Sequence, residues 1–137
     1  MVVFEYPITV RFQHCDPAGI VFYPRYFEMV NACVEAWFEE ALGYSFGRLH
    51  KQLHIGIPTV EAKAEYVRPS RLEDQLTLRL QVTKLGRASV SLQIDIVQAD
   101  ELRVTNKVTL VLTDLAAMKS IAWTSQPQLL HAIEAYI

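Results

Sequence analysis

The sequence has few cysteines, no excess of positive charge and no long apolar run, and each shortage excludes a class of protein. Its 137 residues include two cysteines, Cys15 and Cys33, too few for a disulfide framework. With 13 Lys and Arg against 15 Asp and Glu, the net charge of −2 argues against a nucleic-acid partner. No segment approaches the ~20 apolar residues of a membrane span, and the first residues lack the features of a signal peptide. We therefore expect a cytoplasmic protein with reduced thiols and no membrane partner.

Glycine is also scarce, at five residues, and no linker, low-complexity tract or internal repeat interrupts the chain. Hydrophobic residues make up 51% of the sequence and charged residues 20%, which is a globular composition. A chain of this length can bury a substantial core without metal or disulfide support. Residues 1–137 are therefore interpreted as a single domain.

Five segments alternate apolar and polar residues, which is the pattern of half-buried strands. These segments are residues 4–12, 59–66, 76–83, 88–96 and 104–113. Short turns separate the last four, so we expect antiparallel neighbours. Pro7 predicts that the first strand either lies at a sheet edge or starts late, because proline cannot donate a hydrogen bond to a neighbouring strand.

Between the first two strands the apolar spacing becomes helical, from Pro24 to a C-cap at Gly43. The apolar arc is so broad that this helix should be buried on most sides. Shorter helices are expected at 45–53 and 125–136. The sequence thus predicts an α+β fold, in which a five-stranded antiparallel sheet wraps around one long central helix. Such a wrap leaves an edge strand and a sheet face uncovered, so we expect at least a dimer.

Residues 14–24, HCDPAGIVFYP, connect the first strand to this helix. Asp16 lies on a turn marked by Pro17 and Gly19, and residues 20–23 are apolar. A helix N-terminus presents unpaired N–H groups and a partial positive charge, which suit an oxygen that becomes negative during a reaction. A carboxylate beside such donors favours acyl transfer or hydrolysis. The alternative is an ordinary turn in which Asp16 bonds its own backbone.

The run from Asp16 to Tyr26, with residues 10–12 before it and 56–60 after it, resembles the signature of the 4-hydroxybenzoyl-CoA thioesterase family. Members of that family are hot-dog-fold acyl-CoA thioesterases that assemble as dimers and often as tetramers. The resemblance implies that Asp16 is the catalytic carboxylate, acting as a nucleophile or as a general base on water. It also implies that the backbone N–H of Tyr23 polarises the thioester carbonyl. CoA enters as part of the substrate, and no cofactor or metal is expected.

The resemblance also suggests which residues contact the substrate. The acyl group is expected to meet six residues of the loop, the helix and the second strand: His14, Gly19, Phe22, Tyr26, Asn31 and Thr59. Asn31 stands where hydroxybenzoyl-specific members carry an acid that reads the phenol hydroxyl, so we expect an aromatic or short branched acyl group in general. Arg87 and Ser89, beside a turn, are expected to contact CoA across a subunit boundary.

Two other functions fit the same loop. A hydratase or dehydratase of acyl thioesters would use His14 as its proton shuttle, and a non-catalytic acyl-thioester binder would need no carboxylate. His50 and His54, four residues apart, suggest a metal pair, but no third ligand stands nearby. Cys15 beside His14 is interpreted as a packing residue, because neighbouring side chains point apart.

Overall fold

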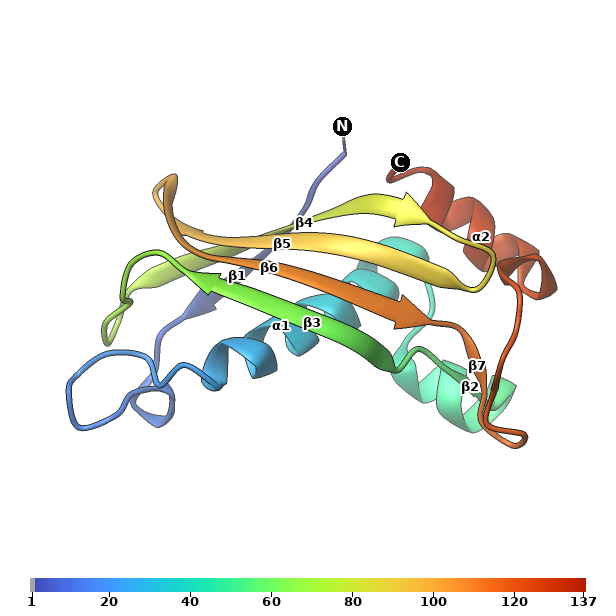
Figure 1. Ribbon diagram of the computed structural model, residues 1–137, viewed down its shortest axis with the longest axis horizontal. Helices are drawn as coiled ribbons and strands as arrows, with labels where there is room; N and C mark the ends of the chain where they lie inside the picture. Colours follow the sequence, from blue (N-terminus) through green and yellow to red (C-terminus); the bar gives the residue numbers. More distant parts are fainter. Residues whose placement is uncertain (1) are drawn as a thin grey trace.

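The computed structural model describes residues 2–137, in which an antiparallel sheet curls around a helix and a smaller sheet lies at one end (Figure 1). The strands are β1 (Phe4–Thr9), β2 (Ile55–Gly56), β3 (Thr59–Tyr66), β4 (Gln75–Leu85), β5 (Ser89–Gln98), β6 (Glu101–Val111), β7 (Thr113–Asp114) and β8 (Lys119–Ser120). The α-helices are α1 (Arg25–Ala36) and α2 (Pro127–Glu134). Short 3₁₀ turns form η1 (Phe12–His14) and η4 (Trp123–Ser125), and π-helical turns form η2 (Trp37–Leu42) and η3 (Arg48–Leu53).

The main sheet has the strand order β1-β4-β5-β6-β3, and every neighbouring pair is antiparallel. The five antiparallel strands expected from the sequence are therefore confirmed, with β1 and its Pro7 at an edge. The expected end of the first strand at residue 12 is wrong. Val10 already bonds the turn before β4, donating to the Asp74 carbonyl at 2.9 Å and accepting from the Glu73 N–H at 2.9 Å. Phe12, 84% exposed, instead begins the turn η1.

The central helix begins and ends near the predicted residues but is shorter in regular α geometry than expected. Pro24 occupies the N-cap of α1, and Gly43 caps the end of η2 in the left-handed region, with φ of 80°. Between them lie 12 α-helical residues followed by six π-helical ones. In Figure 1 this segment crosses the concave side of the sheet.

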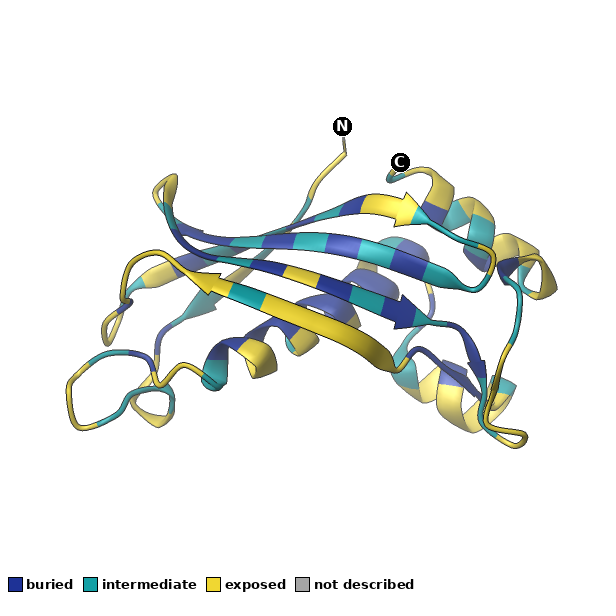
Figure 2. Ribbon diagram, in the orientation of Figure 1, coloured by how far each residue is buried: buried dark blue, intermediate teal, exposed yellow. Residues whose placement is uncertain are grey.

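One broad face of the helix forms the core with the sheet. Cys33, Trp37 and Phe38 are fully buried, and the strands alternate between buried and more exposed residues (Figure 2). The inward-facing sheet residues with no exposed surface are Leu78, Leu80, Val90, Ile94, Ile96 and Val104. The opposite face of α1 carries four exposed residues, Phe27, Glu28, Asn31 and Glu35. Burial on most sides of the helix is therefore not achieved within one chain.

Strand β3 is exposed along nearly its whole length, as the yellow ribbon in Figure 2 shows. Only Ala64 is partly buried, and Val60 and Tyr66 are 61% and 47% exposed. Because β3 is the last strand of the sheet, it pairs with β6 on one side only. This edge could accept another strand.

The shorter elements differ in detail from the expectation. The Ser45 hydroxyl accepts the Arg48 N–H at 3.1 Å and starts η3, which is π-helical. The last helix begins at Pro127, because Ser125 belongs to η4 and donates to the Ala122 carbonyl at 2.6 Å. Strands β2, β7 and β8 have two residues each, too few to show a period in the sequence. Across residues 2–137, every helix falls short of the length and apolarity that a bilayer crossing requires, and the cytoplasmic location stays a prediction.

Candidate active site

Asp16 lies on a tight turn in the loop that leads to the central helix. Its Oδ1 accepts the N–H of Ala18 at 2.8 Å, and its carbonyl accepts the N–H of Gly19 at 2.9 Å. Gly19 has a φ of +81°, a conformation that glycine adopts without strain. The self-bonded turn that was the alternative interpretation is thus present. It occupies one carboxylate oxygen only, since Oδ2 has no hydrogen-bond partner within residues 2–137.

Two backbone hydrogen bonds hold the loop in place, one within the loop and one to the rest of the molecule. The N–H of Phe22 donates to the carbonyl of His14 at 2.9 Å, closing the loop on itself. The N–H of Val21 donates to the carbonyl of the buried Ser70 at 2.8 Å. These contacts make the path from Asp16 to α1 a short antiparallel ribbon.

A partly buried ion pair between Arg103 and Asp74 supports Ser70. Arg103 Nη1 donates to the Ser70 hydroxyl at 3.2 Å and to Asp74 Oδ2 at 2.9 Å. Burial raises the pKa of the Asp74 carboxyl, but the Arg71 N–H and the Arg103 guanidinium outweigh it, so this pKa lies below its ordinary value. The loop therefore rests on a charged network.

Tyr23 presents an unpartnered N–H at the start of α1. The next donors are already engaged: Arg25 N–H bonds the Phe22 carbonyl at 2.8 Å, Tyr26 N–H bonds the Tyr23 carbonyl at 3.3 Å, and Phe27 N–H bonds the Pro24 carbonyl at 3.1 Å. For the Tyr23 N–H there is no acceptor within residues 2–137. This is the donor that the sequence interpretation assigned to the thioester carbonyl.

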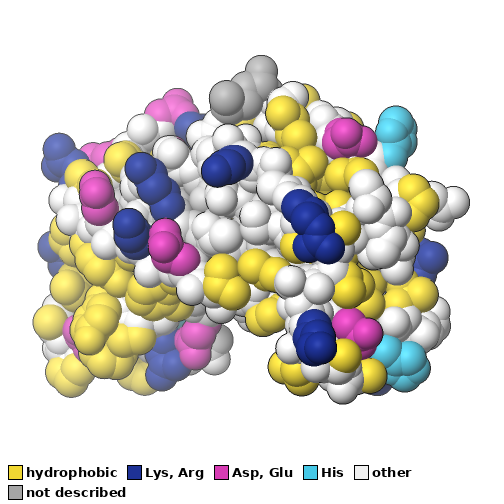
Figure 3. Space-filling view, turned by 45° about the vertical axis from the view of Figure 1, so that its right-hand side comes forward, with side chains coloured by type: hydrophobic (Ala, Val, Ile, Leu, Met, Phe, Trp, Pro, Cys, Tyr) yellow, Lys and Arg dark blue, Asp and Glu magenta, His cyan; other side chains and the backbone are white. Residues whose placement is uncertain are grey.

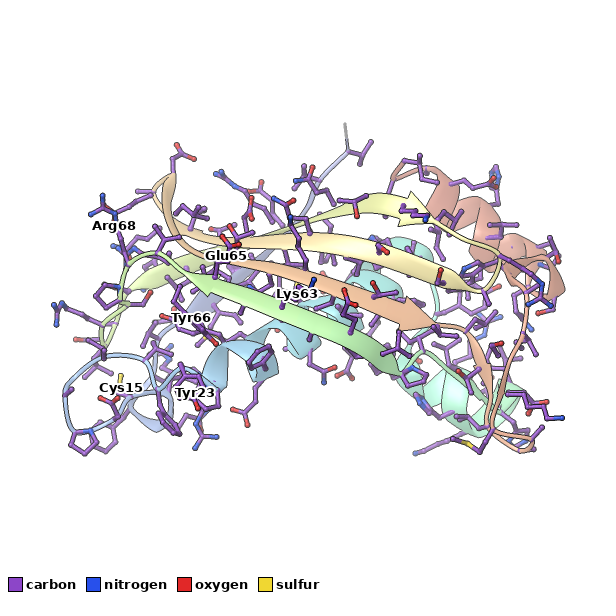
Figure 4. All side chains as sticks on the ribbon, in the orientation of Figure 1. Cys15, Tyr23, Lys63, Glu65, Tyr66 and Arg68 are labelled. Atoms are coloured by element: carbon purple, nitrogen blue, oxygen red, sulfur yellow. The ribbon has the colours of Figure 1, made fainter. Side chains whose placement is uncertain are left out.

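Aromatic rings gather around this helix start. Tyr66, at the end of β3, lies 6.0 Å from Tyr23 and 5.9 Å from Tyr26, between ring centroids, and Figure 4 shows Tyr23 and Tyr66 together. Tyr26 is buried, and its hydroxyl contacts Ser70. Burial raises the pKa of that hydroxyl. Phe22 and Tyr23 are 44% and 60% exposed. The apolar wall expected at residues 20–23 is thus open to water in the single chain.

An apolar pocket of 480 Å³ lies between α1, η3 and the start of β3. Two expected substrate residues, Asn31 and Thr59, line it. Phe27 and His50 also line it, and sequence reasoning missed both as substrate residues. Figure 3 shows hydrophobic side chains on both sides of a hollow between the two lower lobes of the surface. Phe27 is four residues after Tyr23, so one end of the pocket begins about 6 Å along the helix from the free N–H.

Asp16 and Gly19 line a different crevice, of 420 Å³, together with Phe12 and Leu72. Most of the lining of this crevice comes from residues 12–19. The structure therefore brings Asn31 and Thr59 together in one cavity and Asp16 and Gly19 in another.

His14 faces a third, smaller pocket of 290 Å³, with Gln13, Arg25 and Glu28. Its Nδ1 accepts the N–H of Arg11 at 2.8 Å, so a neutral ring carries its hydrogen on Nε2. Burial lowers the pKa of this imidazole, Arg25 and Arg11 lower it further, and Glu28 opposes them. The Nδ1 atom of His14 is therefore already hydrogen-bonded to the backbone.

Arg87 and Ser89 lie at the far end of the sheet from the loop. Asp74 lies just before β4 and beside the loop. Leu85, at the other end of β4, is about 36 Å further along an extended strand. The Ser89 carbonyl accepts the Trp123 indole N–H at 3.0 Å. The two expected CoA contacts thus lie near the pocket end of the molecule, remote from Asp16 of the same chain.

The two histidines that suggested a metal pair do not share a helix face. His50 lies within η3, whereas His54 follows it in the left-handed region with φ of 54°. Within residues 2–137 no group of three His, Cys, Asp or Glu side chains could hold a metal ion.

Named relatives of the chain act on CoA thioesters. The 1,4-dihydroxy-2-naphthoyl-CoA hydrolase of Nostoc punctiforme is 28% identical over 99 residues, covering 71% of this chain and 65% of that protein. The enzyme of the same name from Synechococcus elongatus is 30% identical over 88 residues, covering 64% of each. The chain thus spans somewhat less than two thirds of these relatives.

Solved structures share the fold over most of their length. A 1,4-dihydroxy-2-naphthoyl-CoA thioesterase from Synechocystis superposes with a TM-score of 0.86 at 21% identity, covering 96% of both chains. A gentisyl-coenzyme A thioesterase superposes with a TM-score of 0.77 at 26% identity, covering 81% of this chain and 89% of that one. The expected hot-dog fold is confirmed, and the narrower 4-hydroxybenzoyl-CoA resemblance holds only at the level of the superfamily. The model of the thioesterase-like superfamily matches residues 10–132, so the chain belongs to that superfamily.

Proposed function

We propose that this chain hydrolyses acyl-CoA thioesters to a free acid and CoA. The observation that carries the proposal is the loop of residues 14–24. There, a carboxylate with a free oxygen on Asp16 is followed by the unpartnered N–H of Tyr23 at a helix start. Membership of the thioesterase-like superfamily and relatives named as CoA hydrolases support the same reaction.

The chemistry follows from these two groups. The Tyr23 N–H and the N-terminal dipole of α1 stabilise the carbonyl oxygen as it becomes negative. Asp16 either attacks the carbonyl carbon through Oδ2, forming a mixed anhydride, or takes a proton from the attacking water. In both cases the thiolate of CoA leaves and takes up a proton. In the first case water then hydrolyses the anhydride, which releases the free acid and regenerates the Asp16 carboxylate. Beyond CoA in the substrate, the proposal requires no cofactor.

The 480 Å³ pocket is the proposed acyl chamber. Its walls are mostly apolar, which suits an aromatic or short branched acyl group. Asn31 and Thr59 offer hydrogen-bonding groups inside it. The names of the relatives favour a hydroxylated bicyclic aromatic acyl group such as 1,4-dihydroxy-2-naphthoyl. Phe22 is proposed to border the thioester at the helix start, with Gly19 and His14 at the outer rim. Tyr26, which was expected to contact the substrate, is buried and instead packs against Tyr66.

A second copy of the chain is proposed to pair with β3. Antiparallel pairing about a two-fold axis through the middle of β3 would cover its exposed edge and the open face of α1. Thr59 and Tyr66 are about 23 Å apart along the strand. The pairing would therefore set the Tyr66 end of one copy, with its Tyr23, against the Thr59 end and pocket of the other. A homodimer, itself able to form a tetramer, is the assembly proposed.

The same pairing accounts for Arg87 and Ser89. They lie at the pocket end of the sheet, far from Asp16 of their own chain. In the dimer they would approach the other copy's loop, where the phosphates of CoA must leave the site. The Arg87 guanidinium is suited to a phosphate and the Ser89 hydroxyl to a hydrogen bond with it.

Release of free thiol tests the proposal directly. The protein is incubated with benzoyl-, 2-naphthoyl-, isobutyryl-, palmitoyl- and crotonyl-CoA. CoA release is followed with a thiol reagent, and the enoyl absorbance of crotonyl-CoA is followed in parallel. We expect the aromatic substrates to be hydrolysed with kcat/KM of at least about 10⁴ M⁻¹ s⁻¹ and palmitoyl-CoA to be the poorest. Loss of enoyl-CoA absorbance without thiol release would favour a hydratase, and binding without either reaction would favour a non-catalytic binder.

A further inference from the structure

The side chain of His50 has one defined tautomer. Its Nδ1 lies 2.6 Å from the carbonyl oxygen of Phe46, and a carbonyl can only accept. The hydrogen of the neutral ring is therefore on Nδ1, and Nε2 carries a lone pair. The ring also packs edge-to-face on Phe46, with 5.8 Å between the centroids. These two contacts hold the ring in one orientation.

Nε2 points to a place that the chain keeps clear. A Cβ at Gly56 would lie 3.2 Å from His50 Nε2 and 3.1 Å from Leu115 Cδ2. His50, Gly56 and Leu115 all line the 480 Å³ pocket. Nε2 has no hydrogen-bond partner within residues 2–137. The glycine thus leaves room beside an unused acceptor.

The pocket that His50 lines has mostly apolar walls. Val30 and Val34 of α1 and Val108 and Leu110 of β6 form much of the pocket wall. His50 is exposed in the single chain, so water reaches Nε2 while the pocket is empty. A ligand that fills the pocket displaces this water, and the acceptor is then satisfied only if the ligand brings a donor. A polar group in this position discriminates strongly between ligands that have and lack that donor.

We propose that His50 Nε2 accepts a hydrogen bond from a hydroxyl group on the ring of the acyl substrate, and so makes the enzyme prefer hydroxylated aromatic acyl-CoAs. The inference rests on the proposed function, because that function assigns the pocket to the acyl group. The hydroxyl concerned is one distant from the thioester carbonyl, since the carbonyl is held at a helix start and His50 lies on η3.

Paired substrates isolate this contact. 1,4-Dihydroxy-2-naphthoyl-CoA and 1-hydroxy-2-naphthoyl-CoA differ only in the hydroxyl distant from the carbonyl. 4-Hydroxybenzoyl-CoA and benzoyl-CoA form a second such pair. We expect the wild-type protein to favour the member with the distant hydroxyl by about 10-fold in kcat/KM in at least one pair, the value of one hydrogen bond. The His50→Phe variant keeps a planar ring without nitrogen and should lose that preference.

Two further variants control for folding and for histidine loss in general. The His50→Gln variant keeps an acceptor oxygen and should retain part of the preference. The exposed His131 on α2 lies outside the pocket lining, so His131→Phe should leave the preference unchanged. Because each ratio compares two substrates on one protein sample, a partly unfolded variant does not alter it. An unchanged ratio in His50→Phe, or no wild-type preference in either pair, would overturn the inference while leaving the thioesterase proposal intact.

Binding of the free acids separates the two proposals. Calorimetric titration with 1,4-dihydroxy-2-naphthoic and 1-hydroxy-2-naphthoic acids requires no turnover. A tighter Kd for the dihydroxy acid that disappears in His50→Phe supports the contact even if no thioester is cleaved. Equal affinity of both acids for the wild-type and variant proteins would contradict it.

Discussion

The ring of Tyr66, the last residue of β3, packs against the ring of Tyr23 with 6.0 Å between their centroids. The end of the exposed edge strand is therefore fixed beside the free N–H of the helix start. Any second chain that pairs with β3 is thereby positioned relative to the candidate catalytic loop. This contact couples assembly to activity in the proposed mechanism.

A charge on the edge strand should separate the subunits. Val60 is 61% exposed on β3. In the proposed pairing, a carboxylate at this position would be buried in the interface with the second copy of the chain. We expect wild-type protein to sediment at a multiple of the chain mass of 15.6 kDa, and Val60→Asp at the single-chain mass with low thiol release. Ile137→Asp, 67% exposed at the chain end, should change neither property. A Val60→Asp protein that keeps the wild-type mass would contradict pairing through β3.

Two glycines allow a matched test of the Asp16 turn. Gly19 and Gly43 have φ of +81° and +80°, and neither would bring a Cβ within 4 Å of another atom. Alanine at either position should therefore lower the free energy of unfolding by a similar ~1–2 kcal/mol, from backbone strain alone. Only Gly19→Ala should also lower kcat, because its turn carries Asp16. Equal kcat values for the two variants would show that the turn geometry does not matter for catalysis.

The strands and the central helix could be predicted because their signals are local. Alternation along a strand reports the two faces of a sheet. The predicted segment 76–83 lies within β4, and the segment 88–96 begins one residue before β5. The two ends of the central helix could be predicted from Pro24 and Gly43, because helix-capping preferences are also local in the sequence. The exposure of Phe12 could not be predicted this way, since it depends on bonds between Val10 and the turn before β4, distant in sequence.

The candidate site was only partly visible in the sequence. Asp16 and Tyr23 were found because turn and helix-start residues are consecutive. His50 was missed because its role depends on Gly56 and Leu115, which only the folded chain brings beside it. One local signal was available, since Phe46 precedes His50 by four residues, a spacing at which a ring N–H can reach a backbone carbonyl.

The ion pair behind the loop should make stability depend on pH. The pKa of Asp74 is held below its ordinary value, so its carboxylate stabilises the folded state above about pH 4. That contribution is lost as the pH falls through the lower folded-state pKa. Urea unfolding should give a difference between wild type and Asp74→Asn of about 1.5–3 kcal/mol at pH 7, which shrinks below about pH 4. A difference that grows on acidification would contradict the pairing with Arg103.

The most direct test compares Asp16→Asn with the wild-type protein in the thiol-release assay. Asparagine keeps an oxygen for the N–H of Ala18, so the turn should persist while the charge and the nucleophilic oxygen are lost. Asp95→Asn, on β5 and outside the lining of the Asp16 crevice, serves as the control and should stay within about 2-fold of wild type. We predict that kcat of Asp16→Asn falls at least ~100-fold with the oligomeric state unchanged. A folded Asp16→Asn protein with wild-type kcat would contradict the account.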